Sequence, residues 1–350
     1  MITSAIRSGA RLVPPALRVL AGAGSYVYRG ATPDYAYQSL IRLFCLTRGR
    51  SNDLFARFLS LVRPPYELAA EGGVLGELGA EEETRINTAL REHGYYVFER
   101  RLPSDICDRL LRYALDQPSY VRPTDAEATS GGKPRKTLYS RSAPEGIVYD
   151  FDPEDLINNS DVQALMTDRS LLSVAQRYIG ARPVLDEVNL WWSTAYSSHG
   201  DASAAQLYHF DMDRIRWLKF FIFLTDVGPE NGPHCFVARS HRTGGIPDHF
   251  LARGYTRISE AEVRAAYPGE RLIEFTGPRG TILAEDTRGL HKGKPLTHGD
   301  RLVLEFEFSN SLFGATPLKR SVIRSVRDEE RARFIREHRD TYARWLEPSF

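Results

Sequence analysis

The stretch Gln206-Leu207-Tyr208-His209-Phe210-Asp211-Met212-Asp213 places a histidine and an aspartate two positions apart, among aromatic and apolar residues. On an extended strand, residues two apart project to the same face. An imidazole and a carboxylate on one face are two of the three ligands of a two-His-one-carboxylate metal site, which leaves adjacent coordination positions open. A polar pair of this kind also occurs by chance at strand ends, so the motif needs support from the rest of the chain.

The third ligand is expected from a later strand, because the first two share one strand. Five histidines after the motif are candidates: His234, His241, His249, His291 and His298. Of these, His291 lies 82 residues after His209, behind a predicted strand at 281–285 and the turn Asp286-Thr-Arg-Gly289. Arg301 follows ten residues later and opens a further predicted strand. A guanidinium there is suited to a bidentate, charge-assisted pair with the distal carboxylate of 2-oxoglutarate.

With these residues in place, the chain resembles the phytanoyl-CoA dioxygenase family from about Glu81 to Leu312. The resemblance rests on a series of short motifs: Glu92-His-Gly-Tyr-Tyr-Val-Phe, Tyr178-Ile-Gly-Ala-Arg-Pro, Tyr208-His-Phe-Asp211, Leu224-Thr-Asp-Val-Gly-Pro-Glu-Asn-Gly-Pro-His, Ala238-Arg-Ser-His-Arg242, Gly289-Leu-His291 and Arg301. It implies a double-stranded β-helix, iron(II) bound by His209, Asp211 and His291, and 2-oxoglutarate held by Arg301. Gly293 departs from relatives that carry a serine two positions after the distal histidine. His241 lies in what resembles a structural turn of the family and is interpreted as a loop residue.

The remaining pattern predicts a mainly β core with flanking helices, in three parts. Residues 1–79 form an N-terminal helical extension and linker, residues 80–315 the β-helix oxygenase domain, and residues 316–350 a C-terminal helix. β-branched and aromatic runs at 188–194, 217–226, 272–275, 281–285 and 302–310 predict the strands of a double-sheet jelly roll. Helices are expected at 35–62 with a break at 49–52, at 81–92, at 104–115 and at 170–179.

Several further side chains have two interpretations each. Lys219 shares a face of its predicted strand with Phe221 and Phe223, which makes it either a second anchor for the co-substrate carboxylate or a strand-end lysine in solvent. Glu305 and Glu307 share the face of Arg301, so that one of them either orients Arg301 or meets substrate; the alternative is a pair that faces the surface. Of Trp191 and Trp192, one points inward and one outward.

Residues 118–152, rich in Pro, Gly, Ser and Thr, are predicted to form a long loop that acts as a lid. This segment carries Lys133, Arg135, Lys136 and Arg141, and more arginines lie near the ligands. These charges favour an anionic substrate; the alternative is a solvated loop whose charges pair with acidic residues.

The charge is distributed unevenly along the chain. Residues 1–66 carry nine arginines against two aspartates, a net charge of +7, so with +1 overall the other 284 residues carry −6. The acid-free start of the chain resembles a mitochondrial transit segment or a basic surface in contact with anionic lipid; the alternative is a solvated helical extension. Three widely separated cysteines favour neither a disulfide framework nor a zinc knuckle, so a cytoplasmic location is expected, with a mitochondrial one as the alternative in a eukaryote. No apolar run is long enough for a transmembrane helix, and the overall charge gives no argument for nucleic acid.

The sequence thus predicts an iron(II)- and 2-oxoglutarate-dependent dioxygenase that uses O2 to hydroxylate a small metabolite, a glycan precursor or a lipid-linked substrate. Two rivals stay open. One is a cupin-type metal dioxygenase that uses no keto acid, against which Arg301 argues. The other is a non-catalytic binding or regulatory protein of the same fold, against which the complete ligand set argues.

Overall fold

The computed structural model describes residues 2–68, 72–197, 199–315 and 321–347. Within them, eight strands form an antiparallel sheet in the order β1-β9-β6-β11-β5-β4-β2-β3, and three form a second sheet in the order β10-β7-β8. The strands of the large sheet are β1 (Tyr95–Val97), β2 (Ser119–Val121), β3 (Arg135–Thr137), β4 (Val148–Asp150), β5 (Val184–Thr194), β6 (Trp217–Phe223), β9 (Ile282–Glu285) and β11 (Asp300–Ser309). The small sheet comprises β7 (His234–Val237), β8 (Leu272–Phe275) and β10 (His291–Gly293).

The two sheets face each other, and each long strand divides its side chains between the two faces of the large sheet. On β11, Leu302, Leu304, Phe306 and Phe308 point to one face and join the main hydrophobic core. Val303 points to the other face and packs with Phe221 of β6 and Phe236 of β7, which connects the sheets. Every residue of β6 is buried, because helices cover one of its faces and the second sheet covers the other.

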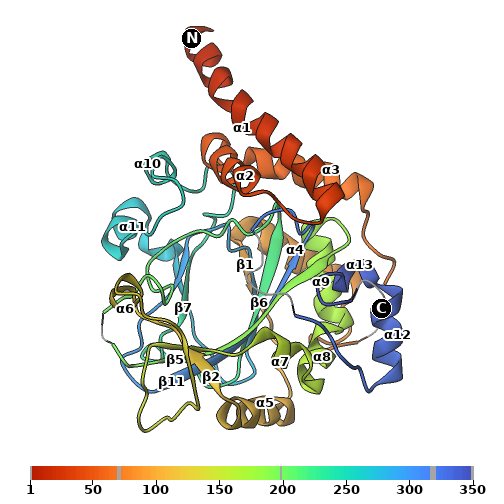
Figure 1. Cartoon of the computed structure of the whole chain (residues 1–350), viewed down its shortest axis with the longest axis vertical. Helices are drawn as coiled ribbons and strands as arrows, with labels where there is room; N and C mark the ends of the chain where they lie inside the picture. The colour runs from red at the N-terminus through yellow and green to blue at the C-terminus, as the bar shows by residue number, and fades with distance from the viewer. Residues whose placement is uncertain (1, 69–71, 198, 316–320, 348–350) are drawn as a thin grey trace.

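The helices gather on the outer face of the large sheet and at one end of it (Figure 1). Those of the main core are α4 (Ala80–His93), α5 (Ser104–Asp116), α7 (Pro153–Ile157), α8 (Ser160–Met166), α9 (Arg169–Ile179), α12 (Glu329–Glu337) and α13 (Arg339–Tyr342). Short helices α6 (Asp125–Thr129), α10 (Asp248–Leu251) and α11 (Glu260–Ala266) lie in the connections. The predicted fold class, a mixed fold with an antiparallel β core, flanking helices and an N-terminal helical extension, is confirmed.

The N-terminal extension consists of α1 (Ile2–Arg29), α2 (Asp34–Thr47) and α3 (Arg50–Val62), and α1 projects from the body (Figure 1). Although proline removes a helical hydrogen bond, α1 continues through Pro14 and Pro15. The extension shares a hydrophobic core with the middle of the chain: Leu40 and Phe44 of α2 belong to the same cluster as Tyr208, Phe210 and Met212. The domain boundaries at 79 and 315 stay predictions, and residues 316–320, where the predicted C-terminal part begins, lie outside the described residues.

The predicted long loop at 118–152 is only partly a loop, since it contains β2, α6, β3 and β4. Strand β4 pairs with β5 through Val148 and Ser193, and β2 pairs with both β4 and β3. Local sequence patterns do not reveal these strands, because each is three residues long and is defined by pairing with distant residues rather than by periodicity. The segment therefore extends the large sheet beside the site.

Candidate metal centre and co-substrate pocket

His209 and Asp211 project into the space between the sheets because their segment is extended and alternates. Tyr208, Phe210 and Met212 point the other way, into the core shared with the N-terminal helices. Backbone hydrogen bonds fix the segment: His209 and His291 exchange N–H···O bonds of 3.0 and 2.8 Å, and the Asp211 N–H donates to Thr287 O at 2.8 Å. This pairing places the third sequence candidate, His291, directly opposite the first.

The three side chains converge on one point. Ligand atoms of His209, Asp211 and His291 all lie within 4.8 Å of one another, and all three residues are buried. The Nε2 atoms of His209 and His291 lie 3.7 and 3.5 Å from the Asp211 carboxylate. Within the described parts of the chain, this is the one group of His, Cys, Asp or Glu with the geometry to hold a metal ion.

Backbone carbonyls orient both imidazoles for metal binding. His209 Nδ1 lies 2.9 Å from Leu207 O, and His291 Nδ1 lies 2.9 Å from Gly289 O, in each case two residues back along the chain. A carbonyl only accepts, so Nδ1 carries the proton and Nε2 presents its lone pair to the centre. Burial lowers the pKa of His209 well below its usual value and that of His291 to about 4, so both rings are neutral at pH 7.

The third ligand is held as a carboxylate. Burial raises the pKa of Asp211, but the charges of Lys219, His291 and His209 and a hydrogen bond from the Thr287 hydroxyl outweigh it and lower the pKa. Thr287 is oriented in turn by Trp217, whose Nε1–H donates to the Thr287 hydroxyl oxygen at 2.8 Å. Such outer contacts fix a ligand's orientation before the metal arrives.

Arg301 lies in the same cavity, which measures about 270 Å³ and is also lined by the three metal-donor residues. Its Nη2 donates to the Ser193 hydroxyl at 3.3 Å, whereas Nε and Nη1 are buried without a hydrogen-bond partner. Burial lowers the pKa of Arg301 to about 10, which still leaves it charged at neutral pH. Buried donors without partners are costly, so this guanidinium fits an anionic ligand such as a carboxylate. Gly293 lies beside it, and a Cβ at that position would be 3.5 Å from Arg301 Nη2.

Lys219 also lies in the cavity, but its ammonium faces carboxylates of the protein. Nζ is 3.1 Å from Asp211 and 3.2 Å from Glu307, and 3.5–3.8 Å from Asp213, Glu305 and Glu187. Burial lowers its pKa, but these charges outweigh burial and raise the pKa well above the usual value. Its role as a second co-substrate anchor therefore stays a prediction.

The two glutamates, the paired tryptophans and His241 occupy distinct places around the centre. Glu305 and Glu307 are buried on the inner face, and in the described residues neither forms an ion pair with Arg301. Trp191 lines the cavity, whereas Trp192 is buried in the main core on the opposite face. His241 lies apart from the centre, with Nε2 3.2 Å from Arg91 O, in agreement with its interpretation as a loop residue.

A buried pair beside the centre escapes prediction from the sequence. His234 packs against His291, with ring centroids 5.5 Å apart, and its Nε2 lies 3.0 Å from Glu285. Burial raises the pKa of Glu285 well above its usual value and lowers that of His234 to about 3, so the pair is neutral. The pairing of β7 with β10 brings His234 here; in the sequence it is one of five candidates for the third metal ligand.

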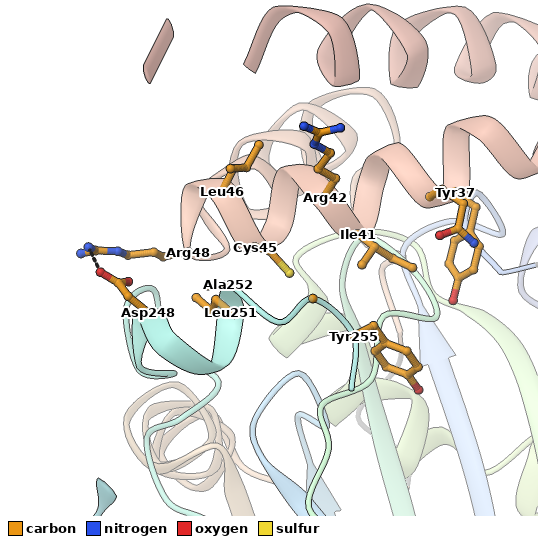
Figure 2. A pocket seen from close by; sticks show the side chains of 12 residues that line it. Tyr37, Ile41, Arg42, Cys45, Leu46, Arg48, Asp248, Leu251, Ala252 and Tyr255 are labelled. Carbon is orange, nitrogen blue, oxygen red and sulfur yellow. Dashed lines mark hydrogen bonds and ion pairs between the residues drawn. The ribbon is translucent and has the colours of Figure 1, made fainter. Parts of the chain in front are cut away.

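A larger groove, of about 920 Å³, lies between α2 and the segment that contains α10 (Figure 2). Arg48 and Asp248 form an ion pair of 2.5 Å at one end of it, while Tyr37 and Tyr255 lie at the other. Burial raises the pKa of both tyrosines, and the charges of Asp211 and Asp213 raise them further, so this end approaches the metal centre. The groove itself contains none of the metal-donor residues.

The fold, the three metal-donor residues and the partly unpartnered guanidinium of Arg301 are typical of one class, the non-heme iron, 2-oxoglutarate-dependent oxygenases. A sequence model of the phytanoyl-CoA dioxygenase family matches residues 90–303, well over half of the chain. The chain therefore belongs to the phytanoyl-CoA dioxygenase family, which confirms the resemblance seen in its motifs. No protein among those with curated functions matches it.

Solved structures of similar shape are distant. AviO1 from Streptomyces viridochromogenes Tue57 is 18% identical, with 68% of this chain and 100% of that chain covered and a TM-score of 0.45. The non-heme alpha ketoglutarate dependent epimerase SnoN from nogalamycin biosynthesis is 17% identical, with 66% and 84% covered and a TM-score of 0.48. HygX from Streptomyces hygroscopicus, solved with nickel, 2-oxoglutarate and hygromycin B, is 16% identical, with 70% and 94% covered and a TM-score of 0.46. The family assignment rests on the sequence match.

Proposed function

We propose that this protein hydroxylates a C–H bond of a small molecule, with Fe(II) bound by His209, Asp211 and His291 and 2-oxoglutarate anchored by Arg301. The observation that carries the proposal is the convergence of three preoriented donor groups and a buried, partly unpartnered guanidinium in one cavity. Bound iron and 2-oxoglutarate supply the oxidation, in which O2 gives one oxygen atom to the substrate and one to succinate as CO2 is released.

The protein's own contribution is ligation, orientation and charge. The Nδ1 hydrogen bonds keep both imidazoles in the metal-binding tautomer. Lys219 lies 3.1 Å from Asp211 and holds its carboxylate toward the histidines. We therefore assign Lys219 to positioning Asp211, which leaves Arg301 as the anchor for the distal carboxylate of the co-substrate.

We further propose that the substrate is neutral or cationic and rich in hydroxyl or amino groups. Beside the metal donors, Glu187 and Glu305 line the cavity, and Asp213 and Glu307 contact the same cation, Lys219. Glu187 and Asp213 are the more accessible, with side chains 31% and 25% exposed. Burial raises the pKa of Asp213 to about 8 and that of Glu305 to about 7, so part of this cluster is protonated at neutral pH. A phosphate or carboxylate would gain no counter-charge from these carboxyl groups, whereas hydroxyl and ammonium donors would find acceptors.

The basic residues of segment 118–152 give weaker support for an anionic substrate than the sequence suggested. Arg135 pairs with Glu145, and Arg141 pairs with Asp300 at 2.7 Å. Lys136 lies over the ring of Tyr120. The two ion pairs offset the charges of Arg135 and Arg141, two of the four basic residues that suggested an anionic substrate. That the segment acts as a lid stays a prediction.

Succinate release tests both parts of the proposal. We expect iron(II)-dependent conversion of 2-oxoglutarate to succinate, stimulated by amino or polyhydroxylated compounds and not by phosphorylated compounds or CoA thioesters. Glu187→Gln should raise the KM for a stimulating amine, while the exposed control Glu77→Gln should not. Succinate release that depends on phosphate esters would contradict the substrate class but not the activity; absence of 2-oxoglutarate consumption with any compound would contradict the activity itself.

A further inference from the structure

The N-terminal extension presents two apolar stripes to the outside. Val13, Leu17, Leu20 and Val27 recur at helical spacing on α1, and Leu54, Phe58 and Leu61 do so on α3. Exposure is 60% for Leu20, 86% for Val27 and 82% for Leu61. These are the surface-facing residues of both helices; other residues, such as Val19 and Ala56, form the contact with the core.

The two stripes flank one continuous apolar groove of about 770 Å³. Its walls include Leu20 and Val27 of α1 and Phe58 and Leu61 of α3, and its floor includes Phe313. Contiguous apolar surface of this kind is rare on proteins that contact only water, and it marks a binding surface. We call the two stripes and the groove the apolar face of the extension.

The three helices of the extension carry unpaired positive charge. Five exposed arginines have no ion-pair partner among the described residues: Arg18, Arg29, Arg42, Arg50 and Arg57. Arg57 lines the groove itself, as does Arg63, which lies 3.7 Å from the Asp340 carboxylate. Of the two aspartates, Asp53 is occupied by Arg216 and Arg288. The extension therefore combines exposed hydrocarbon with a surplus of guanidinium groups.

We propose that the apolar face docks on the surface of an anionic lipid bilayer, with α1 and α3 in the interfacial plane. Leu, Val and Phe side chains would enter the acyl boundary, and the arginines would contact lipid phosphates. A bilayer surface suits both the apolar groove and the arginines. Acyl chains are flexible and can fill a groove of any shape, and anionic headgroups are opposite in charge to the guanidinium groups. In the described residues no helix is long and apolar enough to cross a bilayer, so the contact is peripheral.

Co-sedimentation of the full chain with phosphatidylcholine vesicles, with and without phosphatidylglycerol, tests the proposal. We expect binding only when phosphatidylglycerol is present, and weaker binding at high salt. The double variant Leu20→Glu/Leu61→Glu should weaken binding at least about tenfold, because it removes apolar insertion and adds repulsion. Leu138→Glu is the matched control, since Leu138 is an exposed leucine (56%) outside the face. Arg50→Gln and Arg57→Gln should each cost about fivefold, against no change for the exposed control Arg112→Gln.

Binding that persists in Leu20→Glu/Leu61→Glu, or no binding of the full chain to phosphatidylglycerol vesicles, would overturn the proposal. Sedimentation velocity without lipid tests for self-association through the same face. If the full chain is a dimer that Leu20→Glu/Leu61→Glu converts to monomer, the apolar face binds a second copy and the proposal is also overturned. Without vesicles, succinate release should be the same in wild type, Leu20→Glu/Leu61→Glu, Arg50→Gln and Arg57→Gln, which separates a docking defect from misfolding.

Discussion

At the scale of single residues, the site depends on atoms whose partners are already in place before any metal binds. The two imidazoles have their protons fixed by Leu207 O and Gly289 O, and Asp211 is held by Lys219 and Thr287. Spacing together with the family motifs predicted His209, Asp211, His291 and Arg301 as site residues, and all four line one cavity, while their roles stay predictions. Spacing was insufficient for Glu187, Asp213 and His234, because their approach to the centre follows from strand pairing and not from local pattern.

The ligand variants His209→Ala, Asp211→Ala and His291→Ala should each lower iron(II) affinity by about a hundredfold or more. Loss of a direct ligand should exceed the 10–100-fold typical of losing an outer contact. Isothermal titration with iron(II) under anaerobic conditions measures this. His241→Ala is the control. If His241→Ala lost iron(II) affinity and His291→Ala did not, the third ligand would be His241 and not His291.

Arg301→Leu should weaken 2-oxoglutarate binding about tenfold to a hundredfold and leave iron(II) affinity nearly unchanged. The variant removes a charge-assisted pair worth roughly 1.5–3 kcal/mol. Binding of 2-oxoglutarate to the metal-loaded protein, followed by its charge-transfer absorbance, measures the effect. Equal affinities in wild type and variant would instead favour Lys219 as the anchor.

His241 should contribute to acid sensitivity. Burial lowers its pKa to about 4 from 6.5, so at pH 5 the unfolded chain binds a proton that the folded chain does not. Unfolding is therefore favoured as pH falls from 6.5 toward 4, by about 2 kcal/mol at pH 5 from this residue. Urea unfolding at pH 7 and pH 5 should show a smaller loss of stability in His241→Gln than in wild type. If wild type and His241→Gln lost the same stability between pH 7 and pH 5, the His241 imidazole would not be buried in its neutral form.

At the scale of elements, prediction succeeded where the local pattern carried the information. The helices at 34–47, 50–62, 80–93, 104–116 and 169–179 match the predicted ones within a few residues. Apolar periodicity and terminal residues such as Gly94, which ends α4 with φ +92°, specify them locally. The strands in 118–152 could not be predicted in this way, because their hydrogen-bond partners are elsewhere in the chain.

An ion-pair network joins α3 to the turn that precedes His291. Asp53 accepts hydrogen bonds from Arg216 at 2.7 Å, Arg288 at 3.3 Å and Thr243 at 2.8 Å. Asp53→Asn should lower the free energy of unfolding by about 1–2 kcal/mol, because it leaves two largely buried guanidinium groups short of a charge. Its side chain is 31% exposed, which moderates the effect. Urea denaturation measures it, with Glu77→Gln as control; equal stability of the two variants would show that the network contributes nothing.

At the scale of the whole molecule, the N-terminal extension and the β core share one hydrophobic cluster. Val19, Leu40, Ile41, Leu43 and Phe44 are buried in a cluster that includes residues of the metal-binding segment. The division at residue 79 follows composition, whereas the hydrophobic core crosses it. Local composition does not reveal contacts between residues that are far apart in the sequence.

A chain that begins at residue 67 should therefore fail to fold stably. Burial of those five side chains contributes roughly 8–15 kcal/mol, comparable to the total stability of about 5–15 kcal/mol of a typical protein. Thermal unfolding by circular dichroism should show a broad or absent transition, and iron(II) affinity should fall. A cooperative transition with wild-type affinity would establish the extension as a separate domain.

The side chains of residues 208–212 alternate between the metal site and the hydrophobic core, and this alternation limits where insertions and deletions are tolerated. Odd positions in this stretch face the metal and even positions face the extension. Inserting or deleting one residue here would exchange the two sets, placing phenylalanine in the cavity and a carboxylate in the core. Evolution can lengthen or shorten the loops on either side, but the phase of this segment is fixed, and the distance in sequence between its histidine and aspartate is as constrained as their identities.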